Sequence, residues 1–185
     1  MNNAQSSLGS INRIVWIALM AALTAVGAVV AIPVVPISPV PITLQTMFVL
    51  LAGFILGPKG GALAMLLYIA AGCLGMPVFT GGKAGLAVFL GPTGGFIVGF
   101  IPAAIICGFA KGAPVKPYWV LLLASVVATA VVLALGTVQL ALLLKISIGK
   151  ALAVGVIPFL PGAAAKCFGA VFIYRFLAVR RLIPS

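Results

Sequence analysis

The sequence contains no aspartate, no glutamate and no histidine among its 185 residues. A chain without these residue types has no carboxylate pair, no histidine-based catalytic triad and no ordinary zinc or calcium site. It also lacks the Gly-x-x-x-x-Gly-Lys-Ser/Thr phosphate loop, so the chain itself is not expected to hydrolyse ATP. Proton relays inside membranes use acidic or histidine side chains, which argues against a proton pump. These absences predict a protein that is not an enzyme and needs no metal or other cofactor.

Charged residues are scarce, and all of them carry the same sign. They make up 6% of the chain, and the eleven lysines and arginines give a net charge of +11. Soluble domains carry about a quarter charged residues, whereas this chain is 64% apolar with a mean hydropathy of +1.39. The basic residues are scattered without interleaved aromatics, so nucleic acid is not an expected partner. Cys73, Cys107 and Cys167 lie singly in apolar runs, as small buried hydrophobes do.

The apolar runs predict an all-α integral membrane protein, a compact bundle of six transmembrane helices in one domain over residues 1–185. About twenty apolar residues suffice to cross the hydrocarbon core, and the first run lacks the features of a cleaved signal. Four prolines between residues 33 and 41 predict an extended, polyproline-like connection after the first helix. Pro161 suits the start of the last helix. The expected helices are 14–33, 42–56, 61–76, 94–110, 118–144 and 162–179.

The distribution of lysine and arginine predicts the orientation of the chain. With the N-terminus inside, seven basic residues lie at cytoplasmic ends and three lie in external loops, as the positive-inside rule requires. Both termini are therefore expected in the cytoplasm, and residues 33–41 and 77–99 on the external side. The cytoplasmic set is Arg13, Lys59, Lys111, Lys116, Arg175, Arg180 and Arg181, and the external set is Lys83, Lys145 and Lys150.

Two features on the external side predict a pocket for an anionic solute. Residues 77–99 carry seven glycines between apolar runs, and non-helical backbone near a bilayer must be solvated by protein or by a water-filled cavity. Lys166 lies about 7–8 Å inside the last helix, in a chain without a single acidic side chain to pair with it. Lys83 is near enough in the expected topology to join it. The alternatives are a flexible loop and a lysine that snorkels to lipid headgroups.

Two polar or small-residue patterns each allow two interpretations. The first helix carries alanines at spacings of three and four, which form a smooth face for another helix, either within this protein or in a partner. The alanines are Ala18, Ala21, Ala22, Ala25 and Ala28. Gln45 should point inward from the second helix, where it bonds either a neighbouring helix or a ligand.

Six segments of the chain form a recognisable set of motifs: Pro39-Val-Pro-Ile-Thr-Leu-Gln-Thr, Leu56-Gly-Pro-Lys-Gly-Gly, Gly75-Met-Pro-Val-Phe, Gly81-Gly-Lys-Ala-Gly, Phe89-Leu-Gly-Pro-Thr-Gly-Gly-Phe-Ile-Val-Gly-Phe and Phe159-Leu-Pro-Gly-Ala-Ala-Ala-Lys. Together they closely resemble the BioY family, the biotin-binding S-components of energy-coupling factor (ECF) vitamin transporters. The resemblance implies a multi-pass protein of a prokaryotic plasma membrane that captures biotin on the external side. It further implies docking onto a transmembrane coupling protein driven by cytosolic ATPases. Ala18 and Ala22 match the docking pattern, and Ala21 with Ala25 is a second possibility.

The resemblance implies one substrate-binding residue, and the chemistry of biotin suggests seven more from their residue types and expected positions. Lys166 matches the lysine of the Pro-Gly-x-x-x-Lys motif, and we expect it, together with Lys83, to neutralise the biotin carboxylate. Two polar side chains are candidates for the ureido edge, two aromatic rings for packing on the bicycle, and two glycines for close backbone approach. They are Gln45 and Thr93, Phe79 and Phe89, and Gly82 and Gly94, respectively. Ala163 stands where the family usually has an acidic residue.

Two alternative functions are consistent with the composition. The first is an S-component for another small vitamin, although cationic thiamine fits poorly in a pocket with lysines and no carboxylate. The second is a channel-like or structural membrane subunit without a solute site, surrounded only by lipid. That alternative predicts no saturable binding and no effect of replacing Lys166.

Overall fold

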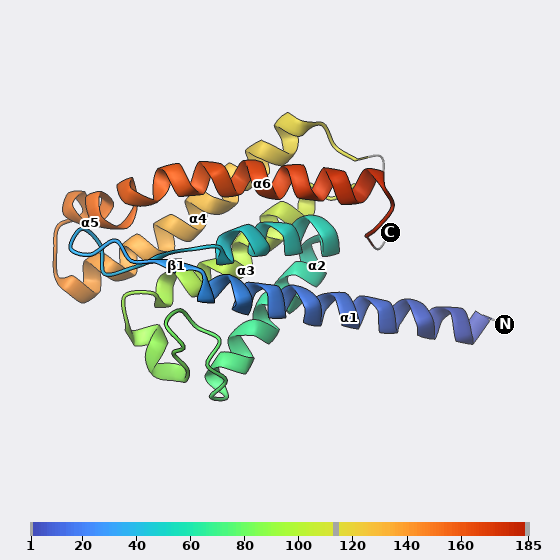
Figure 1. Ribbon diagram of the computed structural model, residues 1–185, viewed down its shortest axis with the longest axis horizontal. Coiled ribbons are helices and arrows are strands. Elements are labelled where there is room, and N and C mark those ends of the chain that lie inside the picture. The colour runs from blue at the N-terminus through green and yellow to red at the C-terminus, as the bar shows by residue number, and fades with distance from the viewer. Residues whose placement is uncertain (1, 113–114, 184–185) are drawn as a thin grey trace.

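The computed structural model describes the backbone of residues 2–112 and 115–183, and the side chains of the same ranges from Ser10 onward (Figure 1). The helices, in chain order, are α1 (Asn2–Val29), α2 (Gln45–Cys73), α3 (Gly94–Phe109), α4 (Tyr118–Leu144), α5 (Ile148–Gly155) and α6 (Leu160–Val179). Two short 3-10 turns, η1 (Leu86–Leu90) and η2 (Ile157–Phe159), precede α3 and α6. The two strands, β1 (Ala31–Ile32) and β2 (Ile42–Thr43), lie between α1 and α2.

Four helical segments of the described chain are long and apolar enough to cross a membrane. They are Ser10–Val29, Gln45–Cys73, Tyr118–Leu144 and Ile148–Val179, the last of which joins α5, η2 and α6. Helix α3 is equally apolar but has only 16 residues. The expected all-α architecture is therefore confirmed, with helices that have the length and composition of membrane spans, and α4 has the expected bounds of 118–144.

Helix α2 combines the two helices that were expected at residues 42–56 and 61–76. Gly57 interrupts it with a left-handed φ of 74°, and Pro58 follows. A Cβ placed on Gly61 would lie 3.0 Å from the Gly53 Cα, although residues eight apart in a straight helix are about 12 Å apart. The chain therefore reverses direction at this point, as Figure 1 shows for the teal and green halves of α2.

Helix α2 forms the centre of the molecule. It packs against α1 on one side and against α3 and α6 on the others, and α4 packs against α3 and α6. Small residues permit close contacts: a Cβ on Gly53 would lie 2.3 Å from the carbonyl oxygen of Ala104 in α3. Aromatic stacking ties α2 to α6, with 5.2 Å between the ring centroids of Phe54 and Tyr174. The core is thus built around α2.

The expectation of an extended connection over residues 33–41 is wrong. The segment folds back on itself, because β1 and β2 pair antiparallel with Ala31 opposite Thr43. The N–H groups of Ile37 and Ser38 both donate to the carbonyl oxygen of Val34, at 2.8 and 3.1 Å. Proline removes only its own N–H group, so the residues between prolines can still close a turn. This hairpin covers one side of the candidate site described below.

Other expected boundaries also differ from the structure. Helix α1 begins at Asn2 rather than at residue 14, and it ends at Val29 rather than at residue 33, because the chain turns into β1 before the first proline. Residues 148–155 lie between the helices expected at 118–144 and 162–179, but they form α5. Its buried residues, Ala151 and Gly155, are four apart and therefore share one face of the helix.

The two ends of the described chain lie at the same end of the molecule, together with the turn at Gly57 (Figure 1). Lys111 lies there too, just after α3. Partial burial and, to a smaller degree, the nearby charge of Arg13 lower the pKa of Lys111 below its usual value. Basic residues from α1 and from the end of α3 therefore gather at this end of the bundle.

Candidate functional site

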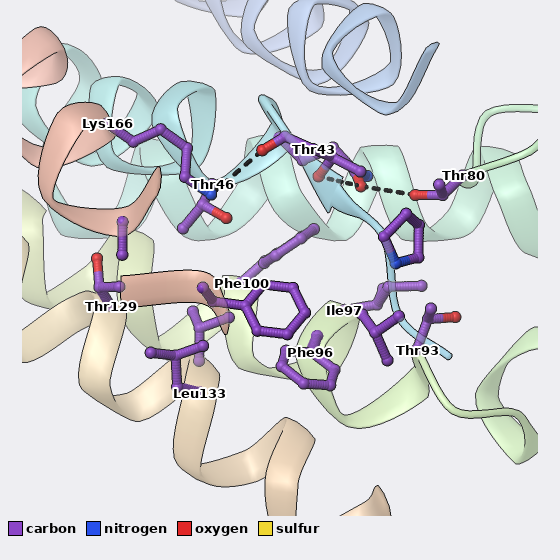
Figure 2. A pocket seen from close by; sticks show the side chains of 16 residues that line it. Thr43, Thr46, Thr80, Thr93, Phe96, Ile97, Phe100, Thr129, Leu133 and Lys166 are labelled. Carbon is purple, nitrogen blue, oxygen red and sulfur yellow. Dashed lines mark hydrogen bonds between the residues drawn. The ribbon is translucent and has the colours of Figure 1, made fainter. Parts of the chain in front are cut away.

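A cavity lies near the other end of the bundle, between the β1–β2 hairpin and helices α2, α3, α4 and α6 (Figure 2). It encloses about 580 Å³ of space between atoms, part of it open to the surroundings. The centre of a water molecule could occupy about 50 Å³ of it, which is room for a few waters. Sixteen residues line it: Val40, Pro41, Thr43, Gln45, Thr46, Thr80, Thr93, Phe96, Ile97, Phe100, Thr129, Val132, Leu133, Phe159, Ala163 and Lys166.

Lys166 is the one charged residue in this lining. It lies in the second turn of α6, whose first turn contains Pro161 as the sequence predicted. Its Nζ donates a hydrogen bond to the carbonyl oxygen of Thr43 in β2, at 3.2 Å. Figure 2 shows the side chain reaching from α6 toward the hairpin rather than away from the cavity. An ammonium group has three donors, so a single carbonyl leaves two for another acceptor.

Gln45 is the centre of a hydrogen-bond network that joins three segments of the wall. Its Oε1 accepts from the hydroxyls of Thr43 and Thr80, at 3.1 and 3.0 Å. Its Nε2 donates to the Tyr68 hydroxyl at 2.6 Å, and that hydroxyl donates to the carbonyl oxygen of Val78 at 3.2 Å. Gln45 is 4% exposed, and its amide is largely occupied by protein partners. It therefore fastens the hairpin and the glycine-rich segment to α2.

The floor of the cavity is apolar and aromatic. Phe96 and Phe100 lie four residues apart on α3, and both face the cavity below the Lys166 side chain in the view of Figure 2. Phe159 comes from η2, and its ring centroid lies 6.1 Å from that of Phe96. The sequence showed these aromatic residues, but their spacing alone did not distinguish a cavity wall from an ordinary helix core.

Ala163 lines the cavity three residues before Lys166, on the same face of α6. It is 8% exposed, so its methyl group fills a buried position next to the ammonium stem. The wall around Lys166 thus combines carbonyl and hydroxyl oxygens with apolar side chains.

Three of the eight predicted binding residues line this cavity: Lys166, Gln45 and Thr93. The other five do not, and each has a structural reason. Phe79 is 2% exposed and packs edge-on against both Tyr68 and Phe89, with centroids 5.5 and 5.8 Å away, so these two phenylalanines form the core of the glycine-rich segment.

The two predicted glycines and Lys83 lie outside the cavity wall. Gly82 is an exposed turn residue with a φ of 70°. Gly94 begins α3, where a Cβ would lie 2.3 Å from the carbonyl oxygen of Phe89. Lys83 is exposed and lines a second, more open cavity of about 660 Å³. Thr93 lines both cavities and therefore lies between them. Lys83 lines only the more open cavity, so it is not beside Lys166.

Gln139 is a structural contributor that the sequence analysis missed. Its Nε2 donates to the carbonyl oxygens of Phe89 and Gly91, at 2.5 and 2.8 Å. These bonds hold the end of η1 against α4 and thereby position Thr93. The sequence signal that could have identified Gln139 is its polar amide inside the apolar run 118–144.

The two alanine pairs of α1 differ in their exposure. Ala18 and Ala22 are both exposed. Ala21 is only 7% exposed, and Ala25 packs against the hydrophobic core. The second pair therefore packs inside this protein, whereas the first leaves a smooth surface on the outside of the bundle.

The sequence profile of the BioY family matches residues 1–185 of the chain. The chain belongs to the BioY family. The BioY relatives include a probable biotin transporter BioY of Pyrococcus horikoshii, 43% identical over 134 residues, which are 72% of this chain and 78% of that protein. A biotin transporter BioY of Rhizobium etli is 34% identical over 148 residues, covering 76% of this chain and 79% of that protein.

The fold of this BioY-family chain is similar to that of a solved relative. The crystal structure of the S-component for biotin from an ECF-type ABC transporter superposes with a TM-score of 0.84. The two chains are 29% identical, and the match covers 96% of this chain and 94% of the other. The BioY arrangement of helices is therefore shared over nearly the whole length.

Proposed function

We propose that this BioY-family chain is the substrate-binding component of an ECF-type uptake transporter, and that it binds biotin. The relatives named above are biotin transporters or a biotin S-component rather than enzymes. Biotin would therefore be the cargo of this protein and not a cofactor. The structure adds a cavity whose chemistry fits such a solute.

The single observation that carries the proposal is the Lys166 ammonium at the edge of an aromatic cavity, in a chain with no acidic side chain. Biotin is a largely apolar acid, with a bicyclic ring and an aliphatic tail that ends in a carboxylate. A charge-assisted bond to that carboxylate would supply the partner that the protein does not contain. The rings of Phe96 and Phe100 would pack on the apolar parts of the molecule.

Threonine hydroxyls would bind the polar ureido edge, because Gln45 is committed to the wall. Thr46 and Thr93 line the cavity, and no described hydrogen bond of their side chains occupies them. The space that the centre of a water molecule can occupy has room for only a few waters, which is less than biotin needs, so we expect lining side chains to rearrange when biotin binds.

The orientation in the membrane follows from the basic residues. We propose six transmembrane segments in a prokaryotic plasma membrane, counting the two halves of α2 separately, with both termini in the cytoplasm. The cavity would then open to the outside, because the cytoplasmic set lies toward the opposite end of the bundle. Arg13 is near the start of the apolar span Ser10–Val29, Lys59 follows the break in α2 at Gly57, and the other five lie at or near the ends of α3, α4 and α6. A cysteine-accessibility experiment on Lys59→Cys and Lys150→Cys in intact cells tests this, with external labelling expected only at residue 150.

We further propose that the exposed Ala18–Ala22 surface of α1 docks on the transmembrane coupling protein, which works with cytosolic ATPase subunits. Small residues four apart let two membrane helices approach closely. The buried Ala21 is unsuited to this role, since it already contacts this protein's own core.

Equilibrium binding on the purified chain tests the proposed substrate. Labelled biotin is expected to bind saturably at one site, and unlabelled biotin and desthiobiotin are expected to displace it. Thiamine and riboflavin are not expected to compete. Tighter binding of thiamine would support the other-vitamin alternative, and absence of any saturable binding would support a structural subunit.

A further inference from the structure

A third cavity lies at the far end of α6 from the candidate site. It is formed by the first turn of α4 and the last turns of α6, and it encloses about 490 Å³ of partly open space. Its lining residues are Tyr118, Phe172, Arg175, Phe176, Val179 and Arg180, which we call the basic groove. On α6, the nearest lining residues of the two cavities, Lys166 and Phe172, are about 9 Å apart along the helix axis, and the two linings share no residue, so the groove and the candidate site are separate.

Aromatic stacking holds both guanidinium groups of the basic groove in place. The central carbon of the Arg175 guanidinium lies 3.9 Å from the ring centroid of Tyr118, which belongs to α4. Arg175 also donates to the carbonyl oxygen of Lys116 at 2.7 Å. The Arg180 guanidinium lies 4.3 Å from the ring centroid of Phe176 on its own helix. A stacked guanidinium keeps its charge and its in-plane N–H donors, so both arginines remain able to bind an oxyanion.

Nothing in the described protein neutralises these two charges. The chain has no aspartate or glutamate, so no side chain can form an ion pair with them. Helix dipoles do not neutralise them either. The N-terminus of α4 and the C-terminus of α6 meet at the groove, and their partial charges of about half a unit have opposite signs. The groove therefore keeps a charge close to two units.

The rest of the basic groove is apolar and exposed. Phe172, Phe176 and Val179 are 65%, 46% and 70% exposed, and their spacing of four and three places them along one stripe of α6. Tyr118 and Trp119 are exposed at the start of α4, at the end of the bundle where a membrane interface favours such residues. An apolar stripe with one cation beside it, Arg175, and a second cation at its end, Arg180, matches the chemistry of an anionic phospholipid.

We infer that the basic groove is a binding site for an anionic phospholipid. Arg175 and Arg180 hold the headgroup phosphate, and the Phe172–Phe176–Val179 stripe contacts an acyl chain. Basic pockets between transmembrane helices bind anionic headgroups in this way. The groove lies on the α6 side of the molecule, whereas α1, with its docking surface, lies on the opposite side of α2 (Figure 1). A lipid is therefore favoured over the coupling protein as the occupant.

Native mass spectrometry of the purified full chain tests this inference with two lipids of identical acyl chains. Phosphatidylglycerol is expected to bind saturably, and zwitterionic phosphatidylcholine is not. The double variant Arg175→Gln/Arg180→Gln is expected to bind phosphatidylglycerol about 30-fold more weakly, since each basic residue near an anionic lipid contributes about 1 kcal/mol. The control variant Lys145→Gln/Lys150→Gln removes the same charge from the other end of the bundle and is expected to bind like the wild type.

Several results would overturn the lipid site. They are equal binding of the two lipids by the wild type, an equal loss in the control variant, unchanged phosphatidylglycerol binding by the double variant, or full competition by glycerol phosphate, which carries the headgroup chemistry without acyl chains. If the double variant still binds phosphatidylglycerol but no longer assembles with the other subunits of the transporter, the groove is a protein contact instead. If loss of the Arg175–Tyr118 contact unfolds the double variant, Arg180→Gln alone is the test. Arg180 is exposed and stacks on its own helix, and its loss is expected to weaken binding about fivefold.

Discussion

Replacement of Lys166 by methionine is the sharpest test of the candidate site. Methionine keeps most of the stem that packs beside Ala163 and removes only the ammonium group. Hydrogen bonds to charged groups contribute about 1.5–3 kcal/mol, so biotin should bind about 10- to 150-fold more weakly. Lys145→Met, which removes an exposed cation on the proposed external side, serves as the matched control and should leave binding unchanged.

The stability of the ligand-free Lys166→Met variant should rise or stay unchanged, although its affinity for biotin falls. The wild-type ammonium is partly buried in an apolar wall, and its one described partner is the carbonyl oxygen of Thr43. Removal of an unpaired charge from such a place relieves a desolvation cost that offsets the lost hydrogen bond. The thermal midpoint of the ligand-free variant should therefore be no lower than that of the wild type, so weaker binding cannot be attributed to unfolding.

A thermal-shift titration measures both effects together. At a biotin concentration of 1,000 times the wild-type Kd, bound ligand should stabilise the wild type by about 4 kcal/mol and the variant by about 1 to 3 kcal/mol. The neutral amide of biotin lacks the carboxylate and should bind both proteins with similar affinity. An equal loss for biotin and its amide would show that Lys166 does not bind the carboxylate, and an unchanged affinity for biotin would refute the role altogether.

The remaining predictions concern the wall and the surface of the bundle. Ala18→Trp and Ala22→Trp should abolish biotin uptake in cells and leave equilibrium binding intact, because both side chains point outward; normal uptake by both variants would place docking elsewhere. Ala21→Trp should instead destabilise the protein by about 1–3 kcal/mol through overpacking, visible as a lower thermal midpoint. Gln45→Leu should cost about 2–4 kcal/mol of stability and weaken binding, since it leaves several buried groups unpaired; a wild-type midpoint would contradict this. Gln139→Leu should free the end of η1 and raise the rate of amide hydrogen exchange at residues 86–93, whereas unchanged exchange would show that other contacts hold the turn.

Gln45 and Phe79 show where inference from the sequence stopped. Both were candidates because a polar amide in an apolar helix and an aromatic ring in a glycine-rich loop are typical of ligand sites. The structure uses both for its own architecture: Gln45 bonds three side chains, and Phe79 packs between Tyr68 and Phe89. A pattern in the sequence specifies the type of contact a side chain can make, but not whether protein or ligand makes it.

The sequence by itself determined the family and the helical, apolar class of this protein, and it identified Lys166 as a candidate site residue. The free energy of transferring a helix into lipid is a sum over the residues of that helix, so the apolar runs identify a membrane protein without knowledge of the packing. The absence of acidic residues likewise requires that the partner of Lys166 is a neutral group or comes from outside the set of side chains. Which surfaces meet was decided only by the tertiary structure. Contacts between residues far apart in the chain close residues 31–43 into a hairpin, bring Phe96 and Phe100 to Lys166 and direct Ala18 outward. No local pattern encodes these contacts.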